Sequence, residues 1–328
     1  MKQFIKKALP YGVMQSYYRN KQKNSIPNRN VKEPSIFNAD GEQMRVFYLQ
    51  DNASTYSYSF TAGRESHKIF WDRDNLLLPI HFYTHEEIFN TQKTARKKFG
   101  YVLEPESCKP ELYKSLYESP KTVGEFDVIF THSAKLLDKY ENAKLYLGQG
   151  VWYGTEIGGG ILDPEAYRHK DLGISMVSSN KTILESHRLR ISIAKEMKKR
   201  GILDTFGAFD GGPSIKIADA LSRYRFSIAL ENEISDYYFT EKILNCFAAM
   251  TIPVYAGANR IGEFFNMDGI IRFDKYASAD DMAKTISICT PAYYEEHIDA
   301  VIDNYNRVQK LLCMDDYIYE EYKELFEI

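Results

Sequence analysis

The fold is decided by the stretch Tyr224-Arg-Phe-Ser-Ile-Ala-Leu-Glu-Asn-Glu-Ile-Ser-Asp-Tyr-Tyr-Phe-Thr-Glu-Lys-Ile-Leu-Asn-Cys-Phe-Ala-Ala-Met-Thr-Ile-Pro-Val-Tyr-Ala-Gly257. Residues 225–230 form a short apolar run, long enough for a buried strand and too short for a helix. Residues 241–250 place apolar side chains at helical spacing after Thr240, a suitable N-cap, and residues 251–256 form a second β-rich run. Strands joined through a helix are normally parallel, and ligands bind beyond their carboxyl ends. The unit therefore predicts a ligand site around the loop of residues 231–239.

The first turn of the predicted helix carries Thr240, Glu241 and Lys242. Free backbone N–H groups and the helix dipole favour an anion there, and Lys242 adds a full positive charge. Glu241 would repel a phosphate, so it is better suited to accepting hydrogen bonds from sugar hydroxyls. The arrangement suits the ribose and diphosphate of a nucleotide, although an ordinary capped helix with surface charges has the same residues.

Three motifs in this stretch resemble the donor-binding signature of the α-1,3-fucosyltransferases, glycosyltransferase family 10. They follow one another in order and without a gap: Leu230-Glu-Asn232, Asp236-Tyr-Tyr-Phe-Thr-Glu-Lys242 and Ile252-Pro-Val-Tyr-Ala-Gly257. Leu230 stands where the family usually has Phe. The resemblance is clear over residues 175–276 and fades toward the N-terminus. Together with the alternation of strands and helices in both halves, it implies an α/β protein of GT-B type, with two Rossmann-like domains facing a cleft.

We expect four segments along the chain: a basic N-terminal arm over residues 1–40, an acceptor-binding domain over 41–165, a donor-binding domain over 166–298, and C-terminal helices over 299–328. The boundary between the domains is placed after the glycine run of residues 158–160, because dense glycines suit a hinge or a close approach to ligand. By analogy with two-domain glycosyltransferases, the C-terminal helices are expected to return to the first domain.

The resemblance also implies roles for single residues outside the signature. In the family, a glutamate at a strand end of the acceptor domain is the general base. Glu104 is the residue that matches it, with Glu106 as the second choice, although both also suit a solvated loop. In the family, an arginine that follows a Ser-Asn loop binds the diphosphate of the donor. Arg188 matches that place and Arg190 competes with it, because the fork of an arginine binds phosphate oxygens bidentately.

Within the signature, the resemblance implies that Asn232 and Glu241 hold ribose and sugar hydroxyls and that Tyr238 packs in the donor pocket. Thr240 and Lys242 would lie at the diphosphate, and Glu231 is a weaker donor-site candidate. The predicted reaction is inverting transfer of L-fucose, or a related 6-deoxyhexose, from a GDP-sugar to a hydroxyl of a glycan acceptor. GDP-fucose is the expected donor, and no cofactor is expected to be required.

Other functions remain open at this point. One is the same scaffold using a different nucleotide sugar, and another is a glycan-binding relative without turnover. Asp72-Arg-Asp74 is a D-x-D of the kind that holds a nucleotide-bound metal in another class of glycosyltransferase, and His81, His85 and Glu86 have a zinc-like spacing if they share a helix face. Each match is short and lacks further ligands, so no metal site is predicted.

Composition and charge bear on the partners. The net charge of −3 over 328 residues argues against a dedicated nucleic-acid binder. Residues 1–32 carry basic side chains and no acidic one, which predicts either contact with an anionic membrane surface or a solvated arm. No apolar run approaches the roughly 20 residues of a membrane span. Together with the family resemblance, whose bacterial members decorate lipopolysaccharide or capsule glycans, this implies a cytoplasmic bacterial protein, peripheral on the inner membrane face, acting on a lipid-linked oligosaccharide in O-antigen (lipopolysaccharide) or capsule synthesis.

Overall fold

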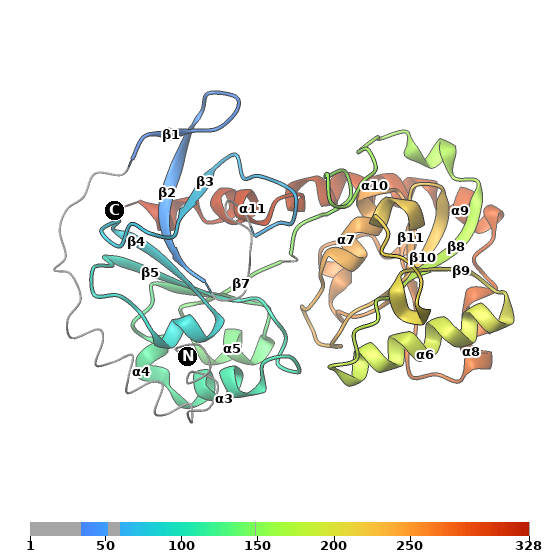
Figure 1. The fold of residues 1–328 in the computed structure, drawn as a ribbon, viewed down its shortest axis with the longest axis horizontal. Helices are drawn as coiled ribbons and strands as arrows, with labels where there is room; N and C mark the ends of the chain where they lie inside the picture. Colours follow the sequence, from blue (N-terminus) through green and yellow to red (C-terminus); the bar gives the residue numbers. More distant parts are fainter. Residues whose placement is uncertain (1–33, 52–59, 148, 328) are drawn as a thin grey trace.

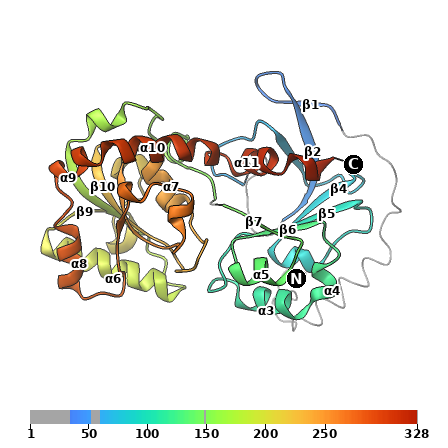
Figure 2. The same ribbon diagram turned by 180° about the vertical axis from the view of Figure 1, so that it is seen from behind.

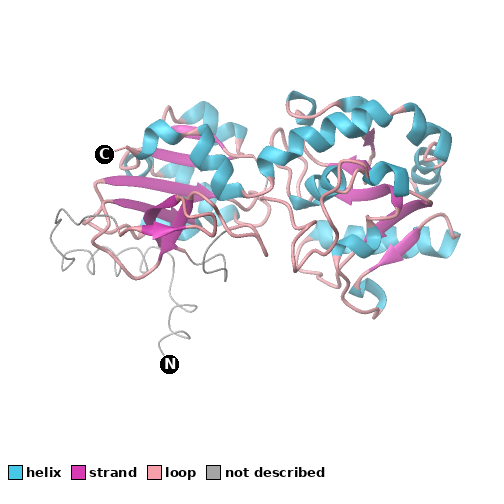
Figure 3. Cartoon of the chain, turned by 90° about the horizontal axis from the view of Figure 1, so that it is seen from above, coloured by secondary structure: helices cyan, strands magenta, loops and turns pink. Residues whose placement is uncertain are grey.

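The computed structural model describes residues 34–51, 60–147 and 149–327, and the basic arm of residues 1–32 lies outside them. The described chain forms two lobes, each built around its own sheet, and the C-terminal helices run from the second lobe to the first (Figure 1). Figure 3 shows the two lobes side by side, with strands at the centre of each and helices around them.

The first lobe contains a seven-stranded sheet in the order β1-β2-β4-β5-β6-β7, with β3 also paired to β2. All pairs are parallel except β1 with β2. Every residue of β4 and β6 is buried, as expected for parallel strands that are covered on both faces. The strands are β1 (Ile36–Phe37), β2 (Gln43–Gln50), β3 (Ile69–Asp72), β4 (Ile80–Thr84), β5 (Lys97–Val102), β6 (Val128–Thr131) and β7 (Ala143–Leu145); the helices are η1 (His85–Phe89), α3 (Pro110–Glu118), α4 (Pro120–Val123) and α5 (Ala134–Lys139).

The second lobe contains a parallel five-stranded sheet in the order β12-β11-β10-β8-β9. From β8 the sheet continues to β9 on one side, whereas β10, β11 and β12 follow one another on the other side. The strand order therefore reverses between β8 and β10, and such a switch point opens a crevice beyond the carboxyl ends of the strands. The strands are β8 (Leu172–Val177), β9 (Asp204–Phe206), β10 (Tyr224–Leu230), β11 (Ile252–Ala256) and β12 (Ile271–Arg272); the α-helices are α6 (Glu185–Arg200), α7 (Glu241–Ala248), α8 (Ala279–Ile286), α9 (Pro291–Glu296) and α10 (Ile298–Val308). Short 3₁₀ helices lie between them: η2 (Ala166–His169), η3 (Ala208–Asp210), η4 (Ile217–Ala220), η5 (Ile261–Glu263) and η6 (Met267–Gly269).

Helices cover the second sheet on both faces. Seen from behind, α6 and α8 lie on one side of the strands, and α7 and α10 lie on the other (Figure 2). Phe226, Ile228 and Leu230 of β10 share an apolar cluster with α6 and α8, whereas Ala229 shares one with α7. That second cluster continues into the aromatic core of the first lobe, so the two lobes share one apolar interior.

The end of the chain packs on the first lobe. After η7 (Gln309–Leu311), α11 (Met314–Glu321) and η8 (Lys323–Phe326) lie against the first sheet. The ring of Phe326 lies 5.4 Å from that of Phe47 and 5.2 Å from that of Phe99. Aromatic pairs at this separation add to the free energy gained from area burial alone.

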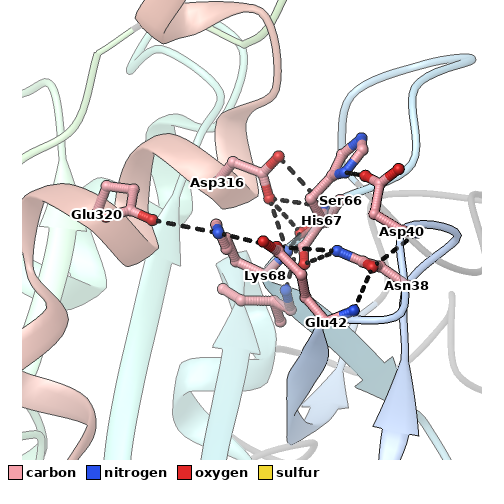
Figure 4. A network of polar contacts seen from close by, with 9 residues as sticks. Asn38, Asp40, Glu42, Ser66, His67, Lys68, Asp316 and Glu320 are labelled. Atoms are coloured by element: carbon pink, nitrogen blue, oxygen red, sulfur yellow. Dashed lines mark hydrogen bonds and ion pairs between the residues drawn. The ribbon is translucent and has the colours of Figure 1, made fainter.

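A polar network fixes α11 to the segment before β3 (Figure 4). Asp316 accepts hydrogen bonds from Ser66 Oγ at 2.6 Å, from the His67 N–H at 2.9 Å and from the Lys68 N–H at 3.1 Å. Lys68 also forms an ion pair with Glu320 across 3.8 Å. One carboxylate of the C-terminal helix therefore satisfies the backbone at the start of a strand in the first lobe.

Two details differ from the sequence predictions. The amphipathic spacing of residues 293–312 in the sequence predicts one continuous helix, whereas the structure divides this stretch into α9, α10 and η7, because His297 leaves the helical conformation between α9 and α10. His81 and His85 do not share a helix face, because His81 lies in β4 and its ring contacts Tyr83 Oη and the Leu78 carbonyl. Among the described residues, no helix is long and apolar enough to cross a membrane.

Candidate active site

A cavity of about 440 Å³ opens at the switch point of the second sheet. Its walls come from the carboxyl ends of β8 and β10, from the first turn of α7, and from a loop of the first lobe that carries Glu104. Six of the residues selected from the sequence line it: Glu104, Arg190, Asn232, Tyr238, Glu241 and Lys242. The cavity thus brings together residues that lie up to 138 positions apart along the chain.

Thr240 is the N-cap of α7, as predicted, and its hydroxyl accepts the Lys242 N–H. Beneath it lies Glu231, the residue after β10, whose carboxylate accepts the Thr240 N–H at 2.9 Å and the Thr240 hydroxyl at 2.8 Å. Gly257 packs against this side chain and the Tyr255 ring: a Cβ on it would lie 2.1 Å from Tyr255 Oη and 2.5 Å from Glu231 Cγ. The end of β10, the Thr240 cap and Gly257 therefore pack together as one unit. Glu231 supports the cavity wall from behind and does not line the cavity itself.

Lys242 lies among acceptors. Its ammonium is 2.9 Å from Thr240 Oγ1, 3.1 Å from Glu241 Oε1 and 3.4 Å from Glu231 Oε2. Burial opposes its charge, but the two carboxylates raise the pKa of Lys242 overall. Burial raises the pKa of Glu231, whereas the charge of Lys242 outweighs burial at Glu241 and lowers the pKa of that carboxyl. Lys242 is therefore an ammonium that is held in place before any ligand binds.

The structure places Arg190, and not Arg188, in the cavity. The Arg190 guanidinium donates to the Leu230 carbonyl at 3.0 Å and to Asn232 Oδ1 at 2.8 Å, and its Nε has no partner among the described residues. Arg188 is exposed, donates to the Thr182 carbonyl at 2.7 Å and does not line the cavity. The preference for Arg188 as the cavity arginine is therefore reversed.

Helix geometry explains this correction. Residues two apart lie on opposite sides of a helix, whereas residues three, four or seven apart share a side. Arg190 stands four residues before Ala194 and seven before Met197, which both pack inward from α6. The same apolar spacing is visible in the sequence, so it was the signal that could have chosen Arg190.

Glu104 and Glu106 are separated in space. Glu104 lines the main cavity from the loop after β5, opposite α7. Glu106 lines a second cavity of about 270 Å³ between the lobes and accepts a hydrogen bond from Tyr117 Oη at 2.8 Å. The rings of Tyr238 and His132 pack at 4.8 Å, with Tyr238 lining the first cavity and His132 the second. The two cavities are therefore neighbours across this aromatic pair.

Part of the cavity lining is not among the residues predicted from the sequence. Trp152 lies on the segment that crosses between the lobes, and Asn245 of α7 fixes that segment by accepting the N–H groups of Trp152 and Tyr153, each at 2.9 Å. Asn245 is buried among the apolar residues of α7 that follow Lys242. A buried amide requires a partner, so this residue was the available signal.

The D-x-D motif lies away from the main cavity. Asp72 Oδ1 accepts the N–H groups of Asp74 and Asn75 at 2.9 and 2.8 Å, which closes a turn after β3. Neither aspartate lines the main cavity. Within residues 34–51, 60–147 and 149–327, no cluster of three or more His, Cys, Asp or Glu side chains has an arrangement suited to a metal ion.

Comparison with solved structures gives the class of fold. An α1,3-fucosyltransferase in complex with GDP-fucose superposes with a TM-score of 0.52 at 15% identity, covering 95% of this chain and 96% of that one. The Anabaena protein Alr3699/HepE, in complex with UDP-glucose, superposes with a TM-score of 0.52 at 9% identity, covering 85% and 98%. The predicted α/β fold of GT-B type is confirmed.

Comparison of sequences gives a family match over the second lobe. Residues 167–298 match the model of glycosyltransferase family 10 (fucosyltransferase), C-terminal domain, and the predicted resemblance is confirmed over this segment.

Individual relatives match over shorter stretches. An α-(1,4)-fucosyltransferase of Arabidopsis thaliana is 31% identical over 81 residues, which cover 24% of this chain and 20% of the relative. The bovine α-(1,3)-fucosyltransferase 4 is 31% identical over 107 residues, covering 30% and 26%. The Helicobacter pylori α-(1,3)-fucosyltransferase FucT is 29% identical over 83 residues, covering 25% and 16%. The chain thus matches less than a third of the length of each of these curated relatives.

Proposed function

We propose that this protein is an inverting glycosyltransferase that moves L-fucose, or a related 6-deoxyhexose, from a GDP-sugar to a hydroxyl of a glycan acceptor. The observation that carries the proposal is the placement of opposite charges on opposite walls of one cavity. Glu104 lines the wall of the first lobe, and Arg190 and Lys242 line the wall of the second. The family 10 match of residues 167–298 and the GDP-fucose bound to a protein of the same fold support this choice of donor.

The chemistry needs two things from this cavity. As the acceptor oxygen bonds to C1 of the sugar, its proton passes to the Glu104 carboxylate. At the same time the bond between C1 and the phosphate oxygen breaks, and its electron pair leaves with the diphosphate. Lys242, Arg190 and the start of α7 stabilise that developing charge. Attack from the side opposite the leaving group inverts the configuration at C1.

The remaining lining residues suit the donor's hydroxyl groups. Glu241 and Asn232 present acceptor oxygens beside the two cations, which fits ribose and sugar hydroxyls. Tyr238 offers a buried ring on which the sugar can pack. For the acceptor we propose the second cavity, where Lys135 and Glu233 lie beside His132.

The deciding experiment measures GDP release and glycan product with GDP-fucose, other GDP-sugars and UDP-sugars over a panel of oligosaccharide acceptors. Turnover with GDP-fucose and an inverted product linkage supports the proposal. Turnover with another nucleotide sugar alone favours the same scaffold with a different donor. Glycan binding without turnover of any donor favours a non-catalytic binding protein.

We also propose that the acceptor is a lipid-linked oligosaccharide of O-antigen or capsule synthesis, met at the cytoplasmic face of a bacterial membrane. The support is the basic sequence of residues 1–32. Co-sedimentation with anionic vesicles, compared with neutral vesicles and with a variant that lacks residues 1–32, tests the membrane contact. Equal sedimentation of the two proteins with anionic vesicles would remove it.

A further inference from the structure

The backbone of Glu104 is held by side chains and not by a neighbouring strand. β5 ends at Val102, and the Glu104 N–H lies 3.2 Å from Nε2 of His85. The Leu103 N–H points at the same nitrogen at 3.3 Å. On the other side, Tyr113 Oη donates to the Glu104 carbonyl at 3.0 Å. Both backbone polar groups of Glu104 are therefore bonded to buried side chains from η1 and α3.

Two features of His85, its backbone conformation and one ring nitrogen, lower the free energy of unfolding. Its φ of 47° lies in the left-handed region, which residues other than glycine rarely adopt. Because Nε2 accepts two N–H groups, the ring hydrogen sits on Nδ1, and that buried nitrogen has no partner among the described residues. Burial lowers the pKa of His85 to about 4, and the charge of Lys109 acts in the same direction, so the ring is a neutral acceptor near neutral pH. A residue chosen for stability alone would avoid both features.

Tyr113 completes the arrangement from α3. Its side chain is fully buried in an apolar cluster, yet its hydroxyl reaches the Glu104 carbonyl and lies 3.4 Å from His132 Nε2. A phenylalanine would fill the same space in this cluster without making the hydrogen bond. The effect of the Tyr113 hydrogen bond can therefore be measured separately from the packing of its ring.

We propose that His85 and Tyr113 are positioning residues that fix the Glu104 peptide so that its carboxylate faces the acceptor hydroxyl. The inference rests on the proposed function, in which Glu104 takes the acceptor proton. A general base must lie within hydrogen-bond reach of that proton, and a misplacement of about 1 Å costs up to about 100-fold in rate. Two neutral hydrogen bonds hold the peptide without adding charge near the carboxylate.

The first test compares Tyr113→Phe with Tyr83→Phe. Both tyrosines are fully buried in the same cluster, but the Tyr83 hydroxyl contacts His81 and the Gln92 N–H and not Glu104. We expect Tyr113→Phe to lower kcat about 10-fold, with the KM for the donor and the Kd for GDP unchanged, and Tyr83→Phe to keep kcat within about twofold of wild type. A kcat for Tyr113→Phe no lower than that of Tyr83→Phe would overturn the inference, even if both variants lose stability.

The second test compares His85→Gln with His85→Leu. Both substitutions place an ordinary side chain at the left-handed position, so they share the backbone strain, but only glutamine presents an acceptor. We expect His85→Gln to retain a kcat at least about fivefold above that of His85→Leu, with the KM for the donor equal in the two. Equal kcat values in the two variants, at any level, would contradict the role of Nε2.

Hydrogen exchange separates this inference from the proposed function. The Glu104 and Leu103 amides should exchange faster in His85→Leu than in His85→Gln, whether or not the protein transfers fucose. If wild-type protein shows no transfer but this difference is found, the proposed function fails and the positioning of the Glu104 peptide stands. If transfer is found and exchange does not differ, the positioning inference fails alone.

Discussion

The two lobes bury their polar groups in different ways. In the first lobe, His81, His85 and His132 are almost fully buried, and burial lowers the pKa of each to about 4, so the two histidines nearest the Glu104 peptide, His85 and His132, are neutral. In the second lobe, the buried carboxylate of Glu231 pairs at the start of α7 with the Lys242 ammonium, which lines the cavity on a side chain that is 22% exposed, and Glu241 lies beside them.

The difference matches two tasks. A neutral hydrogen bond is directional and adds no net charge. The first lobe therefore holds the Glu104 peptide in place without changing the charge around its carboxylate. A paired ammonium keeps its charge in a low-dielectric site, where it acts strongly on a phosphate. If this division is correct, substitutions in the first lobe change turnover, whereas those in the second also change nucleotide binding.

The largest effect is expected for Glu104→Gln. The amide keeps the shape of the side chain but cannot take a proton, so kcat should fall about 100- to 10,000-fold. The Kd for GDP, measured by calorimetry, should stay at its wild-type value because the change lies on the wall of the first lobe. Glu111→Gln is the matched control, since Glu111 is exposed on α3 and lines neither cavity, and it should keep the wild-type activity. Loss of GDP affinity in Glu104→Gln would break the division between the lobes.

Arg190→Ala and Lys242→Ala come next. Each removes a cation from the wall of the second lobe, and each should cost on the order of 2–4 kcal/mol in kcat/KM. GDP affinity should fall as well, because the diphosphate loses a partner in the bound state. Arg188→Ala is the control, two residues from Arg190 on the exposed side of α6. Wild-type GDP affinity in both cavity variants would contradict the diphosphate assignment.

Local sequence patterns predicted the second lobe well. The strand, the Thr240 cap, the helix and the following strand all appear close to their expected limits, because each depends on residues within one turn or one strand. The GT-B fold, which the family resemblance implied, is confirmed. Local patterns could not show which side chains line the cavity. The sequence favoured Arg188, whereas the structure places Arg190 there.

Contacts between distant parts of the chain escaped prediction for a physical reason. His85 meets Glu104 across 19 positions, and Asn245 meets Trp152 across 93. Nothing in the residues near Glu104 encodes the partner that holds its peptide. The left-handed backbone of His85 also cannot be predicted from the sequence, because histidine, although enriched in that conformation, adopts it only in a minority of cases.

Acid should weaken the first lobe more than the second. A buried histidine with a pKa of about 4, against an ordinary value of 6.5, contributes stability that is present above pH 6.5 and lost as the pH falls toward 4. At pH 6 the loss should be about 1 kcal/mol per histidine. The raised pKa of Glu231 has the opposite sign, so its contribution is kept at low pH and lost as the pH rises.

Hydrogen exchange at pH 6.0 and 7.5, corrected for intrinsic rates, measures this difference between the lobes. Protection of the amides in β4 and β5 should fall at the lower pH by more than protection in β10 and β11. An equal loss in the two sheets would mean that they unfold as one unit and that the shared apolar interior dominates over the local titrations.

The smallest effect is expected where the C-terminal helix is fixed to the first lobe. Asp316→Ala leaves the Ser66 hydroxyl and two backbone N–H groups without their carboxylate, and should lower the free energy of unfolding by about 1–3 kcal/mol. Glu320→Ala, one turn further on, removes only an exposed ion pair with Lys68 and should cost less than about 1 kcal/mol. Urea denaturation gives both values. Since neither residue lines the cavity, kcat and the Kd for GDP should stay unchanged below the unfolding transition. A change in kcat for Asp316→Ala would instead show that the contact of α11 with the first lobe sets the distance between Glu104 and the cations opposite it.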